Sequence, residues 1–355
     1  MGNTIQKRNI RLLPLAELQE FFVAHGDKPY RAKQVYEWLW NKSAWSFEEM
    51  TSLSVESRKL LEENFVINHI SVSSQQVSSD LTIKNAFRLY DGNMIEGVLI
   101  PTEKRMTACV SSQVGCSLAC KFCATGKLDR IRNLEADEIY DEVVVINKQA
   151  MENYGKPLTN IVYMGMGEPL LNYNNVLASI EKITSQKGLG MASRRITVST
   201  AGIAKMIRQL GDDYVKFNLA LSLHAANDKK RSSIMPINET NSLNDLKLAL
   251  QHYYYKTNNP VTYEYIIFNN FNDSLEDAAE LACFCSYVPS KVNIIEYNSI
   301  DDPTFEKAEE GRTMAFRNYL ESKKITAKIR RSRGKDIDAA CGQLANKFSS
   351  PKEIG

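Results

Sequence analysis

The chain has 355 residues, of which 43% are hydrophobic and 24% are charged, an ordinary composition for a globular protein with one large core and an accessory domain. It contains no apolar run of about 18 residues, which excludes a membrane-spanning helix, and its first residues lack the apolar core of a signal peptide. The net charge of only +2 means that any nucleic-acid binding depends on local basic patches. We therefore expect a cytoplasmic protein without membrane contact.

Residues 1–92 are predicted to form a separate, mostly helical domain. Apolar side chains recur at helical spacing over residues 12–22, and Pro29 opens a second helix. Trp38 and Trp40 lie on this second helix, where packing in the core is the simplest role for both.

The stretch 81–100 alternates between apolar and other residues in the manner of a β-hairpin, around the turn Asp91-Gly92-Asn93. Pro101 ends the second arm, and Glu96 lies inside that arm among apolar residues. From the residues alone, an exposed carboxylate on a strand and a functional acid are equally good interpretations of Glu96.

After residue 107, segments with strand character alternate with segments of helical character. The clearest helix begins at Asn133, with acidic residues in its first turn, where they favour the helix dipole. Such alternation predicts parallel βαβ units, about six in number, in a core of residues 93–330 that is followed by a C-terminal segment of residues 331–355. The apolar or β-branched runs that predict strands are 107–111, 160–164, 195–200, 215–223, 261–268, 291–297 and 325–330.

Cys116, Cys120 and Cys123, at spacing C-x3-C-x2-C, close a short loop after the first of these strands. Thiolates this close together are usually ligands of a soft metal centre. A structural zinc site would need a fourth Cys or His nearby, and no His lies between His69 and His224. A [4Fe–4S] cluster with one iron left open for another ligand fits better, with zinc or redox-active cysteines as the alternatives.

The cysteine motif, with Phe122 before its last cysteine, resembles the signature of radical S-adenosylmethionine (SAM) enzymes. The flanking stretches 111–116 (Ser-Ser-Gln-Val-Gly-Cys) and 120–126 (Cys-Lys-Phe-Cys-Ala-Thr-Gly) resemble the RlmN-type adenine-C2 RNA methyltransferases and their relative Cfr, which modifies C8. The resemblance extends over most of the chain. It implies an α/β fold with a partial (β/α)6 radical SAM barrel, a [4Fe–4S] cluster and SAM as cofactors, and a small N-terminal domain that helps to hold RNA.

Glycine and polar residues follow several predicted strands, where active sites form in α/β barrels. The segment 165–170 (Gly-Met-Gly-Glu-Pro-Leu) follows one strand, and its glycines let the backbone approach a ligand closely. Glu168 can accept a hydrogen bond from the ammonium group of SAM. From the residues alone, His224 is more often a buried histidine with satisfied hydrogen bonds. The resemblance assigns SAM contact to residues at this rim, namely Gly167, Glu168, Ser199, Ser222, Leu223, His224 and Asn298.

Two further cysteines lie outside the motif. Cys341 follows the last predicted strand, and Cys109 precedes the cysteine loop; a lone cysteine in a loop is usually inert. The stretch 339–344 (Ala-Ala-Cys-Gly-Gln-Leu) nevertheless resembles the same family. The resemblance implies that Cys341 receives a methyl group from SAM, that Cys109 later resolves a protein–RNA thioether by forming a disulfide with Cys341, and that Glu96 accepts the C2 proton.

Basic side chains gather near the predicted site. Residues 323–335 contain seven Lys or Arg and no acid; a solvated surface is the common explanation of such a run, and RNA binding is the alternative. Lys121, Lys127, Arg130 and Arg132 flank the cysteine loop. Reaching one base in structured RNA would require turning it out of its stack. The resemblance implies 23S rRNA and certain tRNAs as substrates, and we further expect a flavodoxin-like external electron donor and a monomer.

We therefore expect a radical SAM methyltransferase that forms 2-methyladenosine in 23S rRNA and certain tRNAs, with two SAM per turnover. Pro169 favours this C2 type over a Cfr-like C8 enzyme, which is the near alternative. A non-catalytic iron–sulfur protein that binds RNA or senses redox state is the alternative from a different class. Cys283 and Cys285 match no motif and are expected to be small buried apolar residues.

Overall fold

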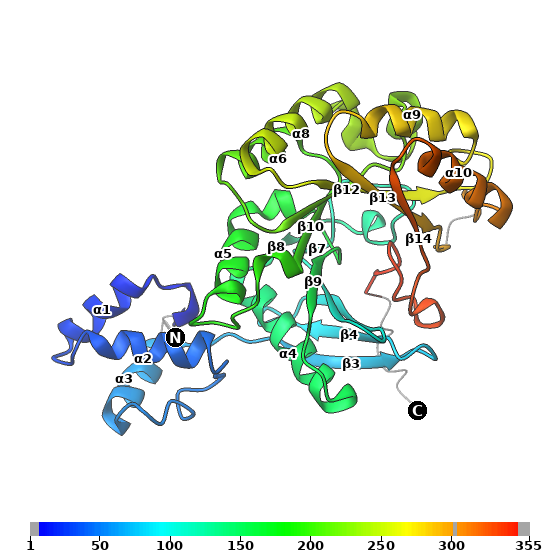
Figure 1. Ribbon diagram of the computed structural model, residues 1–355. Helices are drawn as coiled ribbons and strands as arrows, with labels where there is room; N and C mark the ends of the chain where they lie inside the picture. Colours follow the sequence, from blue (N-terminus) through cyan, green and yellow to red (C-terminus); the bar gives the residue numbers. More distant parts are fainter. Residues whose placement is uncertain (1–6, 301–303, 347–355) are drawn as a thin grey trace.

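The computed structural model describes residues 7–300 and 304–346, and its centre is one large sheet (Figure 1). Within the described residues this sheet has ten strands, in the order β14-β13-β12-β11-β10-β9-β6-β5-β4-β3. Neighbouring strands are parallel from β6 to β14 and antiparallel from β3 to β6. The strands are β3 (Ser71–Val77), β4 (Ile83–Arg88), β5 (Met94–Pro101), β6 (Met106–Val110), β9 (Asn160–Tyr163), β10 (Ile196–Thr200), β11 (Asn218–Ser222), β12 (Val261–Ile267), β13 (Ser290–Glu296) and β14 (Thr326–Arg330).

Helices connect each parallel strand to the next one (Figure 1). Within the described residues the chain thus forms six strand–helix units followed by β14, which confirms the predicted partial (β/α)6 barrel, open between β14 and β3. Each strand that we predicted after residue 107 is present. The connecting helices are α4 (Ala136–Tyr154), α5 (Tyr173–Thr184), α6 (Ala204–Asp212), α7 (Asp228–Ile234), α8 (Leu243–Thr257), α9 (Leu275–Cys285) and α10 (Glu310–Ser322).

Local sequence signals explain where these elements begin and end. A capping box of Glu135 and Glu138 begins α4, so the acids that predicted this helix satisfy its first backbone N–H groups. The same helix ends at Gly155, which adopts the left-handed conformation that glycine allows. β12 is buried along its whole length, as expected of a central parallel strand covered on both sides. No helix in the described part of the chain is both long and apolar enough to span a bilayer.

The N-terminal part is a small helical unit that packs on α4. Arg11 is 6% exposed and donates from Nη1 to both carboxylate oxygens of Asp141 on α4, at 2.8 Å. Trp40 lies 4.8 Å from the Arg11 guanidinium and is 4% exposed, which confirms its predicted place in the core. The elements of this unit are β1 (Arg8–Asn9), η1 (Ile10–Leu12), α1 (Leu15–Ala24), α2 (Tyr30–Trp40), α3 (Val55–Asn64) and β2 (Phe65–Val66).

The predicted domain boundary at residue 92 falls in the turn between β4 and β5. Because β3 and β4 are hydrogen-bonded into the main sheet, residues 71–88 are part of the same structural layer as the barrel. We propose that the helical unit ends with β2, and that the hairpin strands extend the barrel sheet on the side of β6.

Candidate active site

The parallel strands end at a cavity of about 870 Å³ that is partly open to solvent. The carboxyl ends of parallel strands meet at one edge, so loops from distant parts of the chain share this space. The structure brings nine of the predicted site residues into its lining: Cys116, Cys120, Cys123, Gly167, Glu168, Ser199, Ser222, His224 and Cys341. The predicted residues Leu223, Asn298, Cys109 and Glu96 do not line the cavity and lie around it.

The cysteine loop is closed at its base by a short ribbon of β7 (Gln113–Val114) and β8 (Arg132–Asn133). Gly115 has a φ of 76°, and a Cβ at this position would lie 2.0 Å from the carbonyl oxygen of Asp129, so the loop closure requires glycine. Inside the loop, the backbone N–H of Cys123 donates to the carbonyl of Cys120 at 3.1 Å. This tight turn points the three cysteines toward the cavity.

The three thiols fit the ligand set of an iron–sulfur cluster. Burial raises the pKa of Cys116 to about 11, and the nearby Cys123 thiol adds to this, so the thiols lie close enough to repel one another as thiolates. Within residues 7–300 and 304–346, no three His, Cys, Asp or Glu side chains are arranged around one point in the way that a single metal ion requires. Three soft ligands without a fourth protein ligand match a cluster whose remaining iron is open.

Glu168 is buried at the start of the 3₁₀ turn η3 (Pro169–Asn172), with its carboxylate in the cavity wall. Its Oε1 accepts from the N–H of Leu170 at 3.1 Å and its Oε2 accepts from the N–H of Ala201 at 2.8 Å. The preceding Gly167 has a φ of 92°, and a Cβ there would lie 2.4 Å from the Cβ of Gln113. The glycine therefore lets the segment pass the cysteine loop, and two backbone donors fix the direction of the carboxylate.

His224 is buried, and its hydrogen bonds fix its tautomer. The Nδ1 atom accepts from the backbone N–H of Ile266 at 3.0 Å, so the ring proton is on Nε2. Burial, together with the nearby Arg231 cation, lowers the pKa of His224 to about 3. The ring meets Phe122 of the cysteine loop edge-on, with centroids 4.7 Å apart. His224 is thus a neutral side chain that offers a hydrogen-bond donor beside the cysteine loop.

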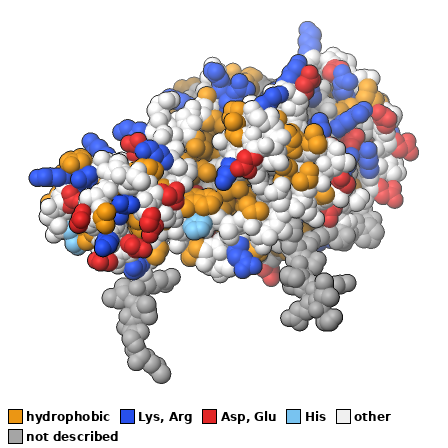
Figure 2. Space-filling model, turned by 90° about the horizontal axis from the view of Figure 1, so that it is seen from below, with side chains coloured by type: hydrophobic (Ala, Val, Ile, Leu, Met, Phe, Trp, Pro, Cys, Tyr) orange, Lys and Arg blue, Asp and Glu red, His pale blue; other side chains and the backbone are white. Residues whose placement is uncertain are grey.

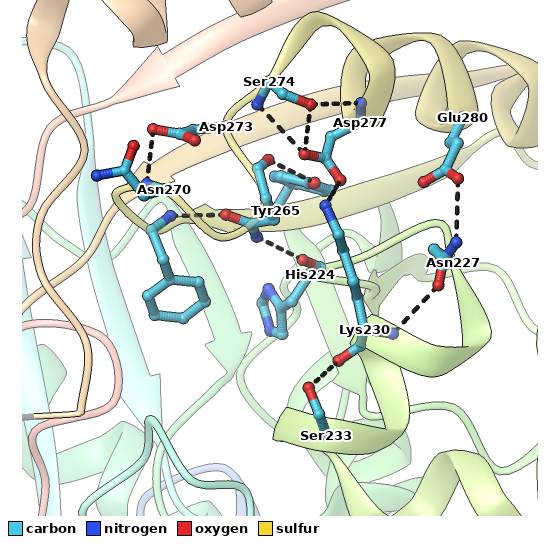
Figure 3. Close-up of polar contacts among 12 residues, drawn as sticks. His224, Asn227, Lys230, Ser233, Tyr265, Asn270, Asp273, Ser274, Asp277 and Glu280 are labelled. Atoms are coloured by element: carbon cyan, nitrogen blue, oxygen red, sulfur yellow. Dashed lines mark hydrogen bonds and ion pairs between the residues drawn. The ribbon is translucent and has the colours of Figure 1, made fainter.

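Polar contacts among residues of α7, of α9 and of the segment that precedes α9 lie next to the loop that carries His224 (Figure 3). The His224 carbonyl accepts from Asn272 Nδ2 at 2.7 Å, and Lys230 Nζ of α7 pairs with Asp277 Oδ1 of α9 at 2.6 Å. Asp277 also accepts from Ser274 at the start of α9. His224 has a left-handed conformation, with a φ of 57°, which a non-glycine residue rarely adopts, and the Asn272 amide binds its carbonyl oxygen in this conformation.

Replacing His224 with glutamine is expected to reduce the acid sensitivity of folding. Between pH 6.5, the ordinary pKa, and about 3, the unfolded chain binds a proton at His224 that the folded chain does not. The stability due to neutral His224 is therefore complete above pH 6.5 and is lost as the pH falls toward 3. Urea unfolding measured from about pH 7.5 to about pH 4.5 should show a steeper loss for the wild type than for His224→Gln. Parallel curves would contradict this account.

Cys341 lies in the C-terminal segment, which crosses the cavity and is held largely through its backbone. The carbonyl oxygen of Cys341 accepts from Asn298 Nδ2 at 3.3 Å, and that of Gly342 accepts from the N–H of Ala124 at 2.7 Å. Farther along, the N–H of Ala345 donates to Glu96 Oε2 at 2.9 Å. The segment therefore places Cys341 between the cysteine loop and β13.

Cys109 is buried on β6, in register with Val98 of β5. Burial, together with the neighbouring Cys341 thiol, raises its pKa to about 12, and the Arg330 cation opposes this rise. Cys109 and Cys341 are thus electrostatic neighbours. Every cysteine in the described part of the chain is a free thiol, so the structure has no disulfide between them.

Glu96 is fully buried on β5 and is engaged at both oxygens. Lys84 Nζ of β4 lies 3.1 Å from Oε1, and the Ala345 N–H binds Oε2. Burial raises the pKa of Glu96, whereas Lys84 opposes this shift. The carboxylate lies beneath the segment that carries Cys341, four residues before Ala345, and outside the cavity lining.

Sequence reasoning missed Glu264 and Arg231 and assigned Arg330 only to a basic run. Glu264 is an acid inside a run of apolar and β-branched residues, which is a signal that could have been used. Arg231 is a fully buried cation on α7, but it stands in a basic stretch of sequence and only the fold shows its burial. Arg330 ends β14 and lines the cavity. The expectation for Cys283 is wrong: it is exposed on α9, whereas Cys285 is buried as expected.

Several of the predicted RNA-binding cations are engaged within the protein. Arg132 binds Asp91 at 2.6 Å and Glu138 at 2.7 Å, and Lys335 binds Glu296 at 2.8 Å. Basic side chains that remain exposed close in sequence to cavity-lining residues include Lys121, Arg130 and Arg331, whereas the exposed Lys328 and Lys324 lie farther back, toward the start of β14 and before it. On the face shown in Figure 2, basic and acidic side chains are interspersed over the N-terminal unit, in keeping with the small net charge.

Comparisons with known proteins agree with this geometry. Residues 8–67 match the model of the ribosomal RNA large subunit methyltransferase N-terminal domain, and residues 110–282 match the radical SAM superfamily. The chain is 61% identical to a probable dual-specificity RNA methyltransferase RlmN of Cytophaga hutchinsonii, over 97% of this chain and 94% of that protein. It is 40% identical to a dual-specificity RNA methyltransferase RlmN of Geotalea uraniireducens, over 97% and 98%. A crystal structure of a radical SAM methyltransferase from Sphaerobacter thermophilus superposes with a TM-score of 0.89 at 38% identity, covering 95% of this chain and 99% of that one.

Proposed function

We propose, because the chain belongs to the RlmN family of radical SAM RNA methyltransferases, that it methylates C2 of adenosine in 23S rRNA and in certain tRNAs. The observation that carries this proposal is one cavity lined by the three motif cysteines, by Glu168 and by Cys341. A further cysteine that shares one cavity with the cluster site and the SAM site has no role in a simple electron carrier. It suits an enzyme that passes the methyl group through the protein.

The residues that hold the cofactors follow from this arrangement. Cys116, Cys120 and Cys123 would bind the [4Fe–4S] cluster, which when bound supplies the electron that cleaves SAM. Glu168, fixed by Leu170 and Ala201, would accept from the methionyl ammonium group of SAM. Gly167, Ser199, Ser222, Leu223, His224 and Asn298 would complete the SAM site, with Leu223 and Asn298 acting from just outside the cavity lining.

Cys341 is the proposed carrier of the methyl group. As a thiolate it would take a methyl group from one SAM. It would then lose a hydrogen atom from that group to the 5′-deoxyadenosyl fragment supplied by one-electron cleavage of a second SAM, and the remaining S-methylene carbon would form a carbon–carbon bond to C2. Glu96, whose anionic form is favoured by Lys84 at 3.1 Å, would take the C2 proton, and the adduct would give up one electron to the cluster. The Cys109 thiolate would then attack the Cys341 sulfur, so that an S–S bond forms while the S–C bond breaks, and the released carbon takes up a proton to complete the methyl group.

The remaining assignments rest on the family and on surface chemistry. We propose that the N-terminal unit and the exposed cations near the cavity hold the RNA backbone, because phosphate contacts supply most of the affinity for RNA. The target adenosine would have to leave its stack to reach Cys341. In keeping with such a substrate, we propose that the protein is a cytoplasmic monomer. A flavodoxin-like donor would supply its electrons.

Nucleoside mass spectrometry tests this proposal. The cluster-loaded protein is incubated without oxygen with SAM, a reductant and unmodified 23S rRNA or tRNA, and the digested RNA is compared with 2-methyladenosine and 8-methyladenosine standards. We expect 2-methyladenosine. The 8-methyl product would instead show a Cfr-like enzyme, and the absence of both methyladenosine and 5′-deoxyadenosine would show a non-catalytic sensor.

A further inference from the structure

We propose that Glu264 is a further ligand-binding residue of the cavity, and that its unpaired carboxylate oxygen accepts hydrogen bonds from the ribose hydroxyl groups of SAM. This inference rests on the proposed SAM site and deepens it, because it names a residue that would make the site specific for a ribose.

The first observation is a buried oxygen without a donor. Glu264 lies in the middle of β12, is 4% exposed and lines the cavity. Its Oε1 accepts from Asn293 Nδ2 at 2.8 Å, whereas Oε2 has no hydrogen-bond partner among the described residues. The nearest cation, Arg330 Nη1, is 3.9 Å from Oε2, too far for a hydrogen bond. Because an unpaired buried acceptor is costly, a donor from a ligand is the natural partner.

The second observation is the position of this oxygen among other polar groups. Ser222 is the register partner of Glu264 on β11, and its hydroxyl lies 3.3 Å from the hydroxyl of Ser199. A carboxylate beside two hydroxyl groups offers both acceptors and donors to the hydroxyl groups of a ligand. One step farther along the sheet, the register pair Ile266 and Ile295 lines the cavity with apolar surface that suits an adenine ring.

The third observation is the separation of Glu264 from Glu168. Glu168 follows β9 and Glu264 lies on β12, three strands away in the sheet order, which is about 14 Å along the sheet. Two carboxylates so far apart contact different parts of one ligand. Arg330 opposes the rise in the pKa of Glu264 that its burial causes, and so favours the anionic acceptor. Because Glu168 is proposed to bind the methionyl ammonium group at one end of SAM, we assign Glu264 to the nucleoside at the other end.

The test is a binding cycle that combines a residue change with a ligand change. Equilibrium binding of SAM and of its 2′-deoxy and 3′-deoxy analogues is measured without oxygen on the cluster-loaded protein, with neither RNA nor reductant present. We expect the wild type to bind SAM about 10–100-fold more tightly than at least one deoxy analogue, since hydrogen bonds to a charged group are strong. Glu264→Gln should lose a similar factor for SAM and should no longer prefer SAM over that analogue.

Glu276→Gln is the matched control, since this carboxylate is exposed in the first turn of α9, just after β12. It should bind all three ligands as the wild type does. If the wild type binds SAM and both deoxy analogues within about twofold, the proposal is overturned, whether or not the variant folds. If Glu264→Gln binds all ligands more weakly but still prefers SAM over the deoxy analogue by the full factor, Glu264 only maintains the shape of the site. The proposal is then also overturned. Methylation is not measured in this experiment, so a failure of the proposed function would appear separately.

Discussion

Replacing Cys341 with alanine is expected to abolish adenosine methylation while SAM binding and iron content stay unchanged. The contacts that hold this part of the C-terminal segment are made by the carbonyl oxygens of Cys341 and Gly342 and by the N–H of Ala345, so alanine preserves them. The substitution removes only the sulfur that would carry the methyl group. Loss of a covalent carrier should reduce methylated adenosine by at least about 1,000-fold, as nucleophile substitutions do in other enzymes.

The control for this prediction is Cys283→Ala, because Cys283 is an exposed thiol on α9 that does not line the cavity. Its product yield should equal that of the wild type. The RNA from each preparation is digested and analysed by mass spectrometry, and iron and SAM binding are measured on the same protein. If Cys341→Ala makes methyladenosine at the wild-type level, Cys341 is not in the mechanism. If it loses iron or SAM binding, the segment that carries Cys341 supports the site in a way that the backbone contacts do not reveal.

The largest effect on stability is expected from replacing Arg231 with methionine. This side chain is fully buried, and its guanidinium joins the ends of β10 and β11. Nε donates to the Leu223 carbonyl at 3.1 Å, Nη1 donates to Asn238 Oδ1 at 2.7 Å, and Nη2 donates to the Ala201 carbonyl. Methionine would fill much of the volume but would leave these acceptors buried without donors. Since each such group costs about 1–3 kcal/mol, we expect a loss of about 3–5 kcal/mol.

Arg317→Met provides the comparison, because Arg317 forms an exposed pair with Glu321 one helical turn away, at 2.8 Å. Exposed pairs of this kind contribute about 0.5 kcal/mol or less. The two variants and the wild type are unfolded in urea under the same anoxic conditions, and their midpoints are compared. A midpoint for Arg231→Met as high as that of Arg317→Met would mean that water or a rearranged backbone replaces the three donors, and the role assigned to Arg231 would fail.

Much of the cavity could be predicted from short stretches of sequence. Gly167 and Glu168 follow one strand, and Ser199 and Ser222 end two others, so a parallel sheet necessarily brings them to one edge. The cysteine loop was also predictable, because Gly115 and the spacing of its three cysteines act within a few residues. Each of these signals is local, and the regular geometry of the parallel sheet then brings the residues together at one edge.

Other positions depended on contacts between distant parts of the chain. Glu96 and Lys84 pair across two antiparallel strands, and the pair is covered by Ala345, some 249 residues farther along the chain from Glu96. Glu264 stands out in the sequence as an acid within an otherwise uncharged strand, but only the fold shows that it lines the cavity. Cys283 and Cys285 show the same limit, because only the packing of α9 makes one thiol exposed and the other buried.

By itself, the sequence determined the order of strands and helices, the cysteine loop and the family to which the chain belongs, because each is encoded in periodicity or in a motif of a few residues. The tertiary structure alone decided which side chains share the cavity and which only support it. Leu223, Asn298, Cys109 and Glu96 lie around the cavity, whereas Glu264 and Arg330 lie in its wall. The physical reason is that burial and hydrogen-bond partners are set by the closing of the barrel and by the C-terminal segment that crosses it, and neither leaves a trace in local sequence.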